Sequence, residues 1–151
     1  MLKRVLGTVA LLGMAMPALA EGEPQLNATQ KMMLEPVHKQ ALEGAVLKLL
    51  KPEEALRLML MARFKAASIM CADIALDERK IVTHVNDLTK DLSSLVEPGQ
   101  MNLPLVAVWY GYATMTGGEI AAAAQDRDSY CALVKALADK GRGSEKLDVL
   151  K

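Results

Sequence analysis

Apolar side chains recur every three or four residues along most of this chain, which is the spacing of one face of an α-helix. Such steps favour the side-by-side packing of helices in a bundle. No segment alternates strictly between apolar and polar residues over a useful length, and hairpin turn signals are absent. The sequence therefore predicts an all-α fold, a bundle of four to five helices. The most regular apolar face consists of Ile81, Val85, Leu88, Leu92 and Leu95.

Prolines mark the first helix boundaries. A helical region is predicted over residues 28–50, with a break or kink at Pro36, because proline cannot donate to the helical hydrogen-bond ladder. Pro52 suits the first turn of the next helix, where the acidic Glu53 and Glu54 favour the positive end of the helix dipole. Helical steps then predict one continuous apolar face made of Leu56, Leu60, Phe64, Ala67, Cys71 and Ile74.

The apolar pattern lapses between residues 76 and 81, where Asp77 can cap a new helix. One long bent helix over residues 53–95 is the alternative, because no glycine or proline marks this break. Pro98 and Gly99 predict a turn. Residues 103–116 are apolar nearly all round, which predicts a helix covered on several sides.

The pair Gly117-Gly118 is a predicted end for that helix, with helix resuming over residues 119–125. Asp126 or Asp128 is then the expected cap of a last helix, which should end near Gly141. Three apolar residues of this last helix are expected to face the core: Tyr130, Val134 and Leu137.

The first twenty residues have the pattern of a cleavable signal peptide. Lys3 and Arg4 precede an apolar stretch, and residues 18–20 read Ala-Leu-Ala, a small-x-small cleavage site. The apolar stretch is shorter than the roughly 20 residues of a spanning helix. We therefore expect a periplasmic or secreted protein, most consistent with a bacterial periplasm, and no integral membrane segment after cleavage. The expected divisions are a signal peptide (1–20), a flexible leader (21–27), a helical domain (28–141) and a loose C-terminal tail (142–151).

Length and charge limit the size of the fold and exclude one class of partner. Cleavage would leave 131 residues, enough for one domain with a single core. It would also leave 16 basic against 18 acidic side chains, with no basic block, so nucleic acid is not an expected partner. The sequence leaves the oligomeric state open.

Cys71 and Cys131 are the only cysteines in the sequence. An even count in an exported chain favours a disulfide between them. Two buried thiols, or two thiolates on a soft metal, are the alternatives.

Histidine offers the best candidate for acid–base or metal chemistry. His84, Asp87 and Asp91 fall on one helical stripe, where an imidazole and two carboxylates could ligate a divalent ion. The stripe lies opposite the apolar face that begins at Ile81, so we interpret it as an ordinary solvated face. The methionines are not spaced for a copper site and fit a role as gap fillers.

Motifs of catalysis and cofactor binding are missing from the sequence. It contains no C-x-x-C, no G-x-S-x-G, no H-E-x-x-H and no glycine-rich phosphate loop. We therefore predict a non-enzymatic protein with no catalytic residue, no cofactor and no metal. Trp109 and Tyr112 share a helix face and form a possible binding surface, because these residue types dominate binding hot spots. The alternative is that Trp109 fills the core.

Residues 71–78, Cys-Ala-Asp-Ile-Ala-Leu-Asp-Glu, resemble the first-cysteine segment of the small periplasmic acid-stress chaperones, which are helical and carry one disulfide. The region before Cys71 and the spacing to Cys131 depart from that family, and membership is not inferred. The expected function is a binding or adaptor protein for a protein or peptide partner. The alternative is an acid-stress chaperone that exposes apolar helix faces at low pH, and a metal-binding protein or enzyme using His84 is an outsider.

Overall fold

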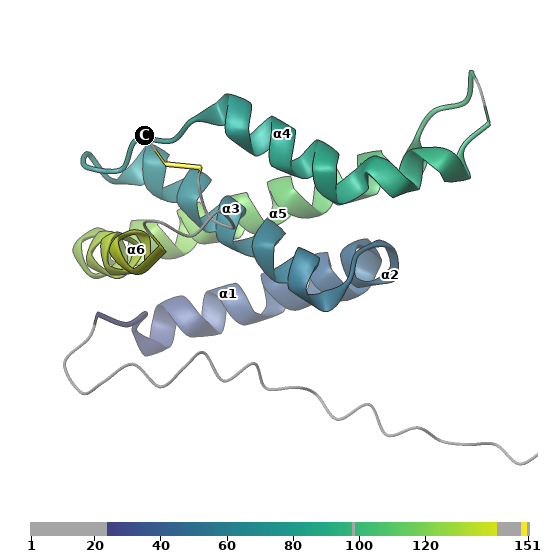
Figure 1. Ribbon diagram of the computed structural model, residues 1–151. Helices are drawn as coiled ribbons and strands as arrows, with labels where there is room; N and C mark the ends of the chain where they lie inside the picture. Colours follow the sequence, from purple (N-terminus) through teal and green to yellow (C-terminus); the bar gives the residue numbers. More distant parts are fainter. Residues whose placement is uncertain (1–23, 98, 142–148, 151) are drawn as a thin grey trace, which may run out of the picture.

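The computed structural model describes residues 24–97, 99–141 and 149–150, and in them the protein is an all-α bundle, as predicted (Figure 1). Helix α5 lies at the centre of the contacts, because both α1 and α3 pack along it. Figure 1 shows α4 and α1 on opposite sides of α3 and α5, with α6 at one end. The elements are α1 (Ala28–Ala41), the π-helical η1 (Leu42–Val46), α2 (Leu47–Leu49), α3 (Pro52–Met70), α4 (Glu78–Thr89), the 3-10 segment η2 (Lys90–Leu95), α5 (Leu103–Gln125) and α6 (Arg127–Gly141).

Helix α1 begins at a capping box and runs through its proline. The Asn27 side chain accepts a hydrogen bond from the Gln30 amide, and the Gln30 side chain accepts one from the Asn27 amide. Pro36 does not interrupt α1, so the predicted break there is wrong. Pro36 lies on the exposed side of the helix, where water can satisfy the carbonyl that loses its amide partner. The irregularity falls at η1 instead, which directly follows α1.

The chain from 53 to 95 forms two α-helices and a 3-10 segment, not one long helix. Helix α3 ends at Met70, and Cys71 has an extended backbone. The Asp77 side chain accepts a hydrogen bond from the Arg79 amide and caps α4, as the first of the two alternatives predicted. The predicted continuous apolar face is wrong at its start, because Leu56 is 40% exposed, and at its end, because Cys71 and Ile74 lie beyond α3. The packing of α3 against several neighbours widens its buried face to Ala55, Leu58, Met61, Ala62, Arg63, Phe64, Ala66 and Ala67.

Helix α5 continues through Gly117 and Gly118, so the predicted interruption there is wrong. The reason is packing against α1 and the segment that follows it. A methyl group added at Gly118 would lie 2.6 Å from Val37 Cγ1, and one added at Gly111 would lie 2.5 Å from Val46 Cγ2. These two glycines are seven residues apart on one face of α5 and allow its close approach to α1 and η1.

We expect Gly118→Ala to destabilise the fold by about 1–3 kcal/mol, because the added methyl group overpacks a close helix contact. Gly117→Ala is the matched control, since a Cβ at Gly117 meets nothing within 4 Å. At a protein concentration at which the chain is monomeric, the control should be neutral or stabilising by up to about 1 kcal/mol, because alanine has the higher helix propensity. Urea unfolding at low micromolar protein measures both variants, and equal stability of the two would contradict the close-contact explanation.

The end of the chain is packed rather than loose at the two residues that the structure describes there. Val149 is fully buried, and its carbonyl accepts a hydrogen bond from the Asp77 amide at 2.8 Å. Leu150 forms an isolated antiparallel bridge with Leu76. The expected loose tail is therefore wrong at residues 149 and 150, while residues 142–148 and 151 lie outside the described part.

The predicted signal peptide, residues 1–20, lies outside the described residues. Of the predicted leader, residues 24–27 are described, and Leu26 packs partly against the core. Within the described ranges, none of the helices combines the length and the apolar character that crossing a membrane requires.

Candidate functional site

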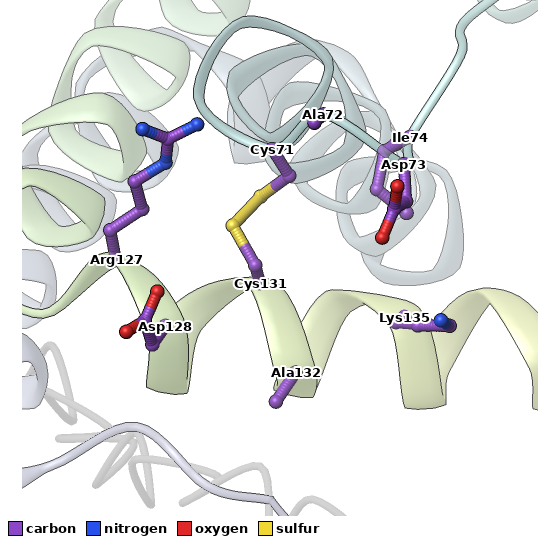
Figure 2. A pocket seen from close by; sticks show the side chains of 9 residues that line it. All are labelled: Cys71, Ala72, Asp73, Ile74, Arg127, Asp128, Cys131, Ala132 and Lys135. Carbon is purple, nitrogen blue, oxygen red and sulfur yellow. A yellow bond between two sulfur atoms is a disulfide. The ribbon is translucent and has the colours of Figure 1, made fainter.

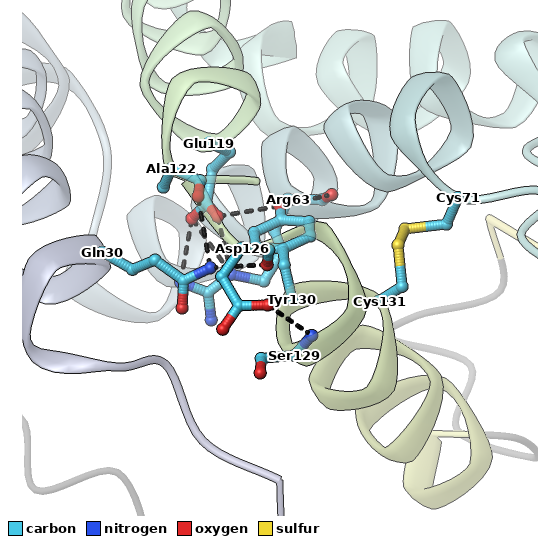
Figure 3. Close-up of a disulfide and its surroundings, with 9 residues drawn as sticks. All are labelled: Gln30, Arg63, Cys71, Glu119, Ala122, Asp126, Ser129, Tyr130 and Cys131. Atoms are coloured by element: carbon cyan, nitrogen blue, oxygen red, sulfur yellow. Dashed lines mark hydrogen bonds and ion pairs between the residues drawn. A yellow bond between two sulfur atoms is a disulfide. The ribbon is translucent and has the colours of Figure 1, made fainter. Parts of the chain in front are cut away.

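The centre of the bundle contains a buried ion pair between α3 and α5 (Figure 3). Arg63 Nε donates to both carboxylate oxygens of Glu119, at 3.0 Å and 3.1 Å. Arg63 Nη2 lies 2.8 Å from Glu119 Oε1. Glu119 is fully buried and Arg63 is 4% exposed. Burial of both charges makes this pair a dominant electrostatic feature of the core.

Two further helices contribute to this ion cluster, which we define as His38, Arg63, Glu119 and Tyr130. The Tyr130 hydroxyl on α6 donates to Glu119 Oε2 at 2.9 Å. His38 Nε2 on α1 lies 3.1 Å from Glu119 Oε1, an ion-pair distance when the imidazole is protonated. The cluster therefore joins α1, α3, α5 and α6 through the carboxylate of one residue.

The pKa values within the ion cluster follow from burial and contact. Burial alone would raise the pKa of Glu119, but the contacts of His38 and the charge of Arg63 outweigh it and lower this pKa below its usual value. Burial, together with the negative charge of Glu119, raises the pKa of Tyr130. At neutral pH the carboxylate is ionised and the phenol is neutral, which is the state that the hydrogen bond between them requires.

The geometry of the ion cluster is that of a structural element and not of an open catalytic centre. Both oxygens of Glu119 are occupied by protein groups, and no part of this residue is accessible to solvent. A substrate could reach the carboxylate only if the helices separated. Two buried nitrogens of the ion cluster, Arg63 Nη1 and His38 Nε2, make no hydrogen bond of regular geometry within the described part of the chain, so His38 faces Glu119 at ion-pair distance only.

A second buried polar contact lies next to the ion cluster and joins α1 to the C-terminal end of α5. The Gln30 side chain is fully buried, and its amide nitrogen donates to the carbonyls of Ala122 and Asp126, at 3.2 Å and 2.9 Å (Figure 3). Asp126 caps α6 by accepting from the Ser129 amide at 3.1 Å, which confirms one of the two predicted caps. Hydrogen bonding by Ser129, through its side chain first and its amide second, lowers the pKa of Asp126.

The predicted disulfide between Cys71 and Cys131 is present and joins the end of α3 to α6. It borders a surface pocket of about 320 Å³ (Figure 2). The pocket places the cations Arg127 and Lys135 among the anions Asp73 and Asp128. Because the charges balance, this lining favours no particular charge on a ligand.

The structure divides the predicted His84 stripe between two elements, with His84 and Asp87 on α4 and Asp91 on η2. His84 is partly buried, whereas Asp87 and Asp91 are exposed. The described residues contain no group of three or more histidine, cysteine or acidic side chains that could hold a metal ion.

We expect His84→Ala to change the free energy of unfolding by less than about 0.5 kcal/mol, as for an ordinary surface site. The melting temperature of the unsubstituted protein should not move when zinc or copper is added. Thermal denaturation with and without each metal tests both points. A rise with metal that disappears in His84→Ala would instead support a metal site.

The two aromatic residues singled out in the sequence lie together on α5. The rings of Trp109 and Tyr112 make an edge-to-face contact with centroids 5.6 Å apart. Tyr112 is 9% exposed, and its burial raises the pKa of its phenol to about 12. Trp109 is partly buried and packs against the core. Most of this pair thus faces inward.

The exposed aromatic residue of α5 is Tyr110, which the sequence analysis did not single out. Tyr110 is 71% exposed, and large apolar side chains are also exposed in the first turns of α5 and just before the helix. Periodicity could not identify this surface, because α5 is apolar on every side. We define the α5 apolar surface as Met101, Leu103, Val106 and Tyr110, each at least 50% exposed.

The ion cluster was also missed by the sequence analysis, although one signal for it exists. Glu119 is the only acidic or basic residue within residues 103–125. A single charge on an otherwise apolar helix requires a buried partner, but periodicity could not identify Arg63 as that partner. The chain matches no protein-family model, no curated protein and no solved structure.

Proposed function

We propose that this protein is an exported, non-enzymatic binding protein that docks a protein partner on the α5 apolar surface. The observation that carries the proposal is the exposure of Met101, Leu103, Val106 and Tyr110, between 50% and 73% each, at one end of the longest helix. Contiguous exposed apolar side chains mark interaction sites on soluble proteins, and tyrosine is enriched among binding hot spots.

The α5 apolar surface lies on a helix that is capped at its start and packed into the core on its other side. The Asn102 side chain caps α5 by accepting from the Leu105 amide at 3.0 Å. On the inward side of the same helix, Val108 and Tyr112 are buried in the core. A partner that docks here would therefore meet a preorganised helix, which lowers the entropic cost of binding.

Export is the second part of the proposal. The pattern of residues 1–20 supports it, and so does the disulfide, because such bonds persist in oxidising compartments. Mass spectrometry of the protein from cell fractions tests it. Recovery of a chain that begins at Glu21, outside the cytoplasm, is the expected result, and an intact chain in the cytoplasm would contradict it.

Photo-cross-linking tests the binding surface directly. A photoreactive phenylalanine analogue at Tyr110 should give a discrete protein adduct in cells. The same analogue at Met32, which is 70% exposed on α1, is the matched control and should give none. Absence of any adduct from Tyr110, or equal adducts from both positions, would overturn the proposal.

The ion cluster favours one further candidate, an acid-responsive chaperone. Protonation of Glu119 would remove the charge that joins four helices, so that acid could part them and expose the apolar faces inside. The test is aggregation of a client protein at about pH 2–3, and again on neutralisation, with the oxidised and the reduced protein. Protection that is lost on reduction would favour the chaperone, and no protection would leave the binding protein.

A further inference from the structure

The exposed face of α5 extends beyond the α5 apolar surface along the whole helix. Apart from the terminal Gln125, the exposed positions recur in steps of three or four residues, and none of them is charged. They form one stripe with large side chains in its first half and small ones in its second. We define this α5 stripe as Leu103, Val106, Tyr110, Ala113, Gly117, Ala121 and Ala124.

We propose that the α5 stripe pairs with the α5 stripe of a second copy of this chain, with the two helices antiparallel across a twofold axis. The proposal rests on the proposed function, since it identifies the protein partner that docks there. A twofold axis between residues 113 and 114 brings Leu103 opposite Ala124, Val106 opposite Ala121, and Tyr110 opposite Gly117. Each large side chain of one copy then meets a small residue of the other, and the contact is self-complementary as a twofold interface requires.

Gly117 gives independent support for the pairing. It has a helical backbone, so the conformational freedom of glycine is not needed. A Cβ at this position meets nothing within 4 Å, so no contact within the described chain needs glycine either. Glycine inside a helix nevertheless costs about 0.5–1 kcal/mol relative to alanine. A tyrosine from a second copy, seated against Gly117, explains why the smallest residue occupies this position.

Charge permits a dimer, and area shows how much more surface the interface must include. The α5 stripe carries no charge, and the predicted cleaved chain has 16 basic against 18 acidic side chains, so electrostatic repulsion between two copies is small. Side chains of this size offer about 150–200 Å² when fully exposed, so the four residues of the α5 apolar surface offer about 400–500 Å². A stable interface needs about 800 Å² per partner. The second half of the stripe and the neighbouring helices have to supply the remainder.

Light scattering and sedimentation of the purified, oxidised protein test the association. The unsubstituted protein is expected at twice the chain mass. Gly117→Leu should raise the dissociation constant at least tenfold, because its side chain fills the space that Tyr110 of the second copy needs. Ala132→Leu is the control, since it adds the same side chain at an exposed position of α6, and it should leave the dimer unchanged. Far-UV circular dichroism should show that both variants are folded.

Cysteine cross-linking tests the orientation of the helices. A mixture of Tyr110→Cys and Gly117→Cys chains should form a covalent dimer on mild oxidation, and Ala113→Cys should do so alone. Tyr110→Cys alone should cross-link at least tenfold less, because its two copies lie about 10 Å apart along the antiparallel helices. Efficient cross-linking of Tyr110→Cys alone would show parallel helices and overturn the proposed pairing.

The two proposals fail in different ways. A monomeric protein whose photoreactive residue at position 110 captures a different protein would overturn the dimer and leave the binding function. A monomeric protein with no adduct at that position would overturn both. A dimer that Gly117→Leu does not weaken would place the interface elsewhere and would overturn the pairing of the α5 stripes.

Discussion

Glu119→Gln should lower the free energy of unfolding at neutral pH by about 3–5 kcal/mol, because it leaves the buried charge of Arg63 without a partner. The substitution keeps the shape of the side chain, so the loss reports charge and not packing. Guanidinium-induced unfolding measures it. Glu35→Gln is the matched control, since Glu35 is exposed on α1, and its effect should stay within about 0.5 kcal/mol.

The double variant Arg63→Met with Glu119→Leu separates two quantities. One is the net contribution of the ion pair to stability, and the other is the destabilisation caused by leaving one buried charge unpaired. Apolar replacements of similar volume remove both buried charges, so most of the stability lost in Glu119→Gln should return. In the double variant the Tyr130 hydroxyl loses the carboxylate acceptor and keeps only the backbone carbonyl of residue 63, at 3.4 Å, which limits the recovery. A double variant less stable than Glu119→Gln would contradict this account of the ion cluster.

The stability of the unsubstituted protein and that of Glu119→Gln should depend differently on pH, and the sign of the difference follows from the pKa of Glu119. The folded pKa of Glu119 lies below the ordinary value of 4.5, so its ionised form stabilises the fold above that pH. This stabilisation is lost as the pH falls through the folded pKa. The unsubstituted protein should therefore lose more stability than Glu119→Gln on acidification below about pH 4.5. Parallel loss in both proteins would show that Glu119 does not titrate in this range.

The fold class could be predicted from the sequence because amphipathic helices repeat apolar residues every three or four positions. Asp77 as a cap and Pro52 in a first turn were confirmed, since these features act within a few residues of the chain. The prediction that Gly117-Gly118 ends the helix is wrong because of a contact with another helix. The local preference of two glycines is to end a helix, but the close contact of Gly118 with Val37 keeps α5 continuous.

The candidate sites were harder to predict, because they depend on which side of a helix faces solvent. Helix α5 is apolar all round, so the sequence could not distinguish the buried Tyr112 from the exposed Tyr110. The ion cluster brings together residues from four helices, and its longest separation in sequence, from His38 to Tyr130, is visible only in three dimensions. The disulfide was predictable because the sequence offers one pairing.

Removal of the disulfide should destabilise the protein by about 4 kcal/mol. The bond closes a loop of 60 residues. In the chain-entropy model, its loss increases the conformational entropy of the unfolded chain and so lowers the free energy of the unfolded state by about this amount. The double variant Cys71→Ala with Cys131→Ala should show the loss at neutral pH, measured by guanidinium-induced unfolding. Reduction of the unsubstituted protein is the second route to the same state, and it should give a loss within about 1 kcal/mol of the first.

The slope of the unfolding transition shows in which state the disulfide acts. If the bond mainly restricts the unfolded chain, its removal lets that chain expand and expose more surface, so the dependence of stability on denaturant should steepen. The folded protein should change little, because Tyr130 remains fully buried beside Cys131 and still donates to Glu119, which holds α6 against α5. Loss of stability without a steeper slope, together with loss of the near-UV signal of the aromatic side chains before unfolding, would place the effect in the folded state instead.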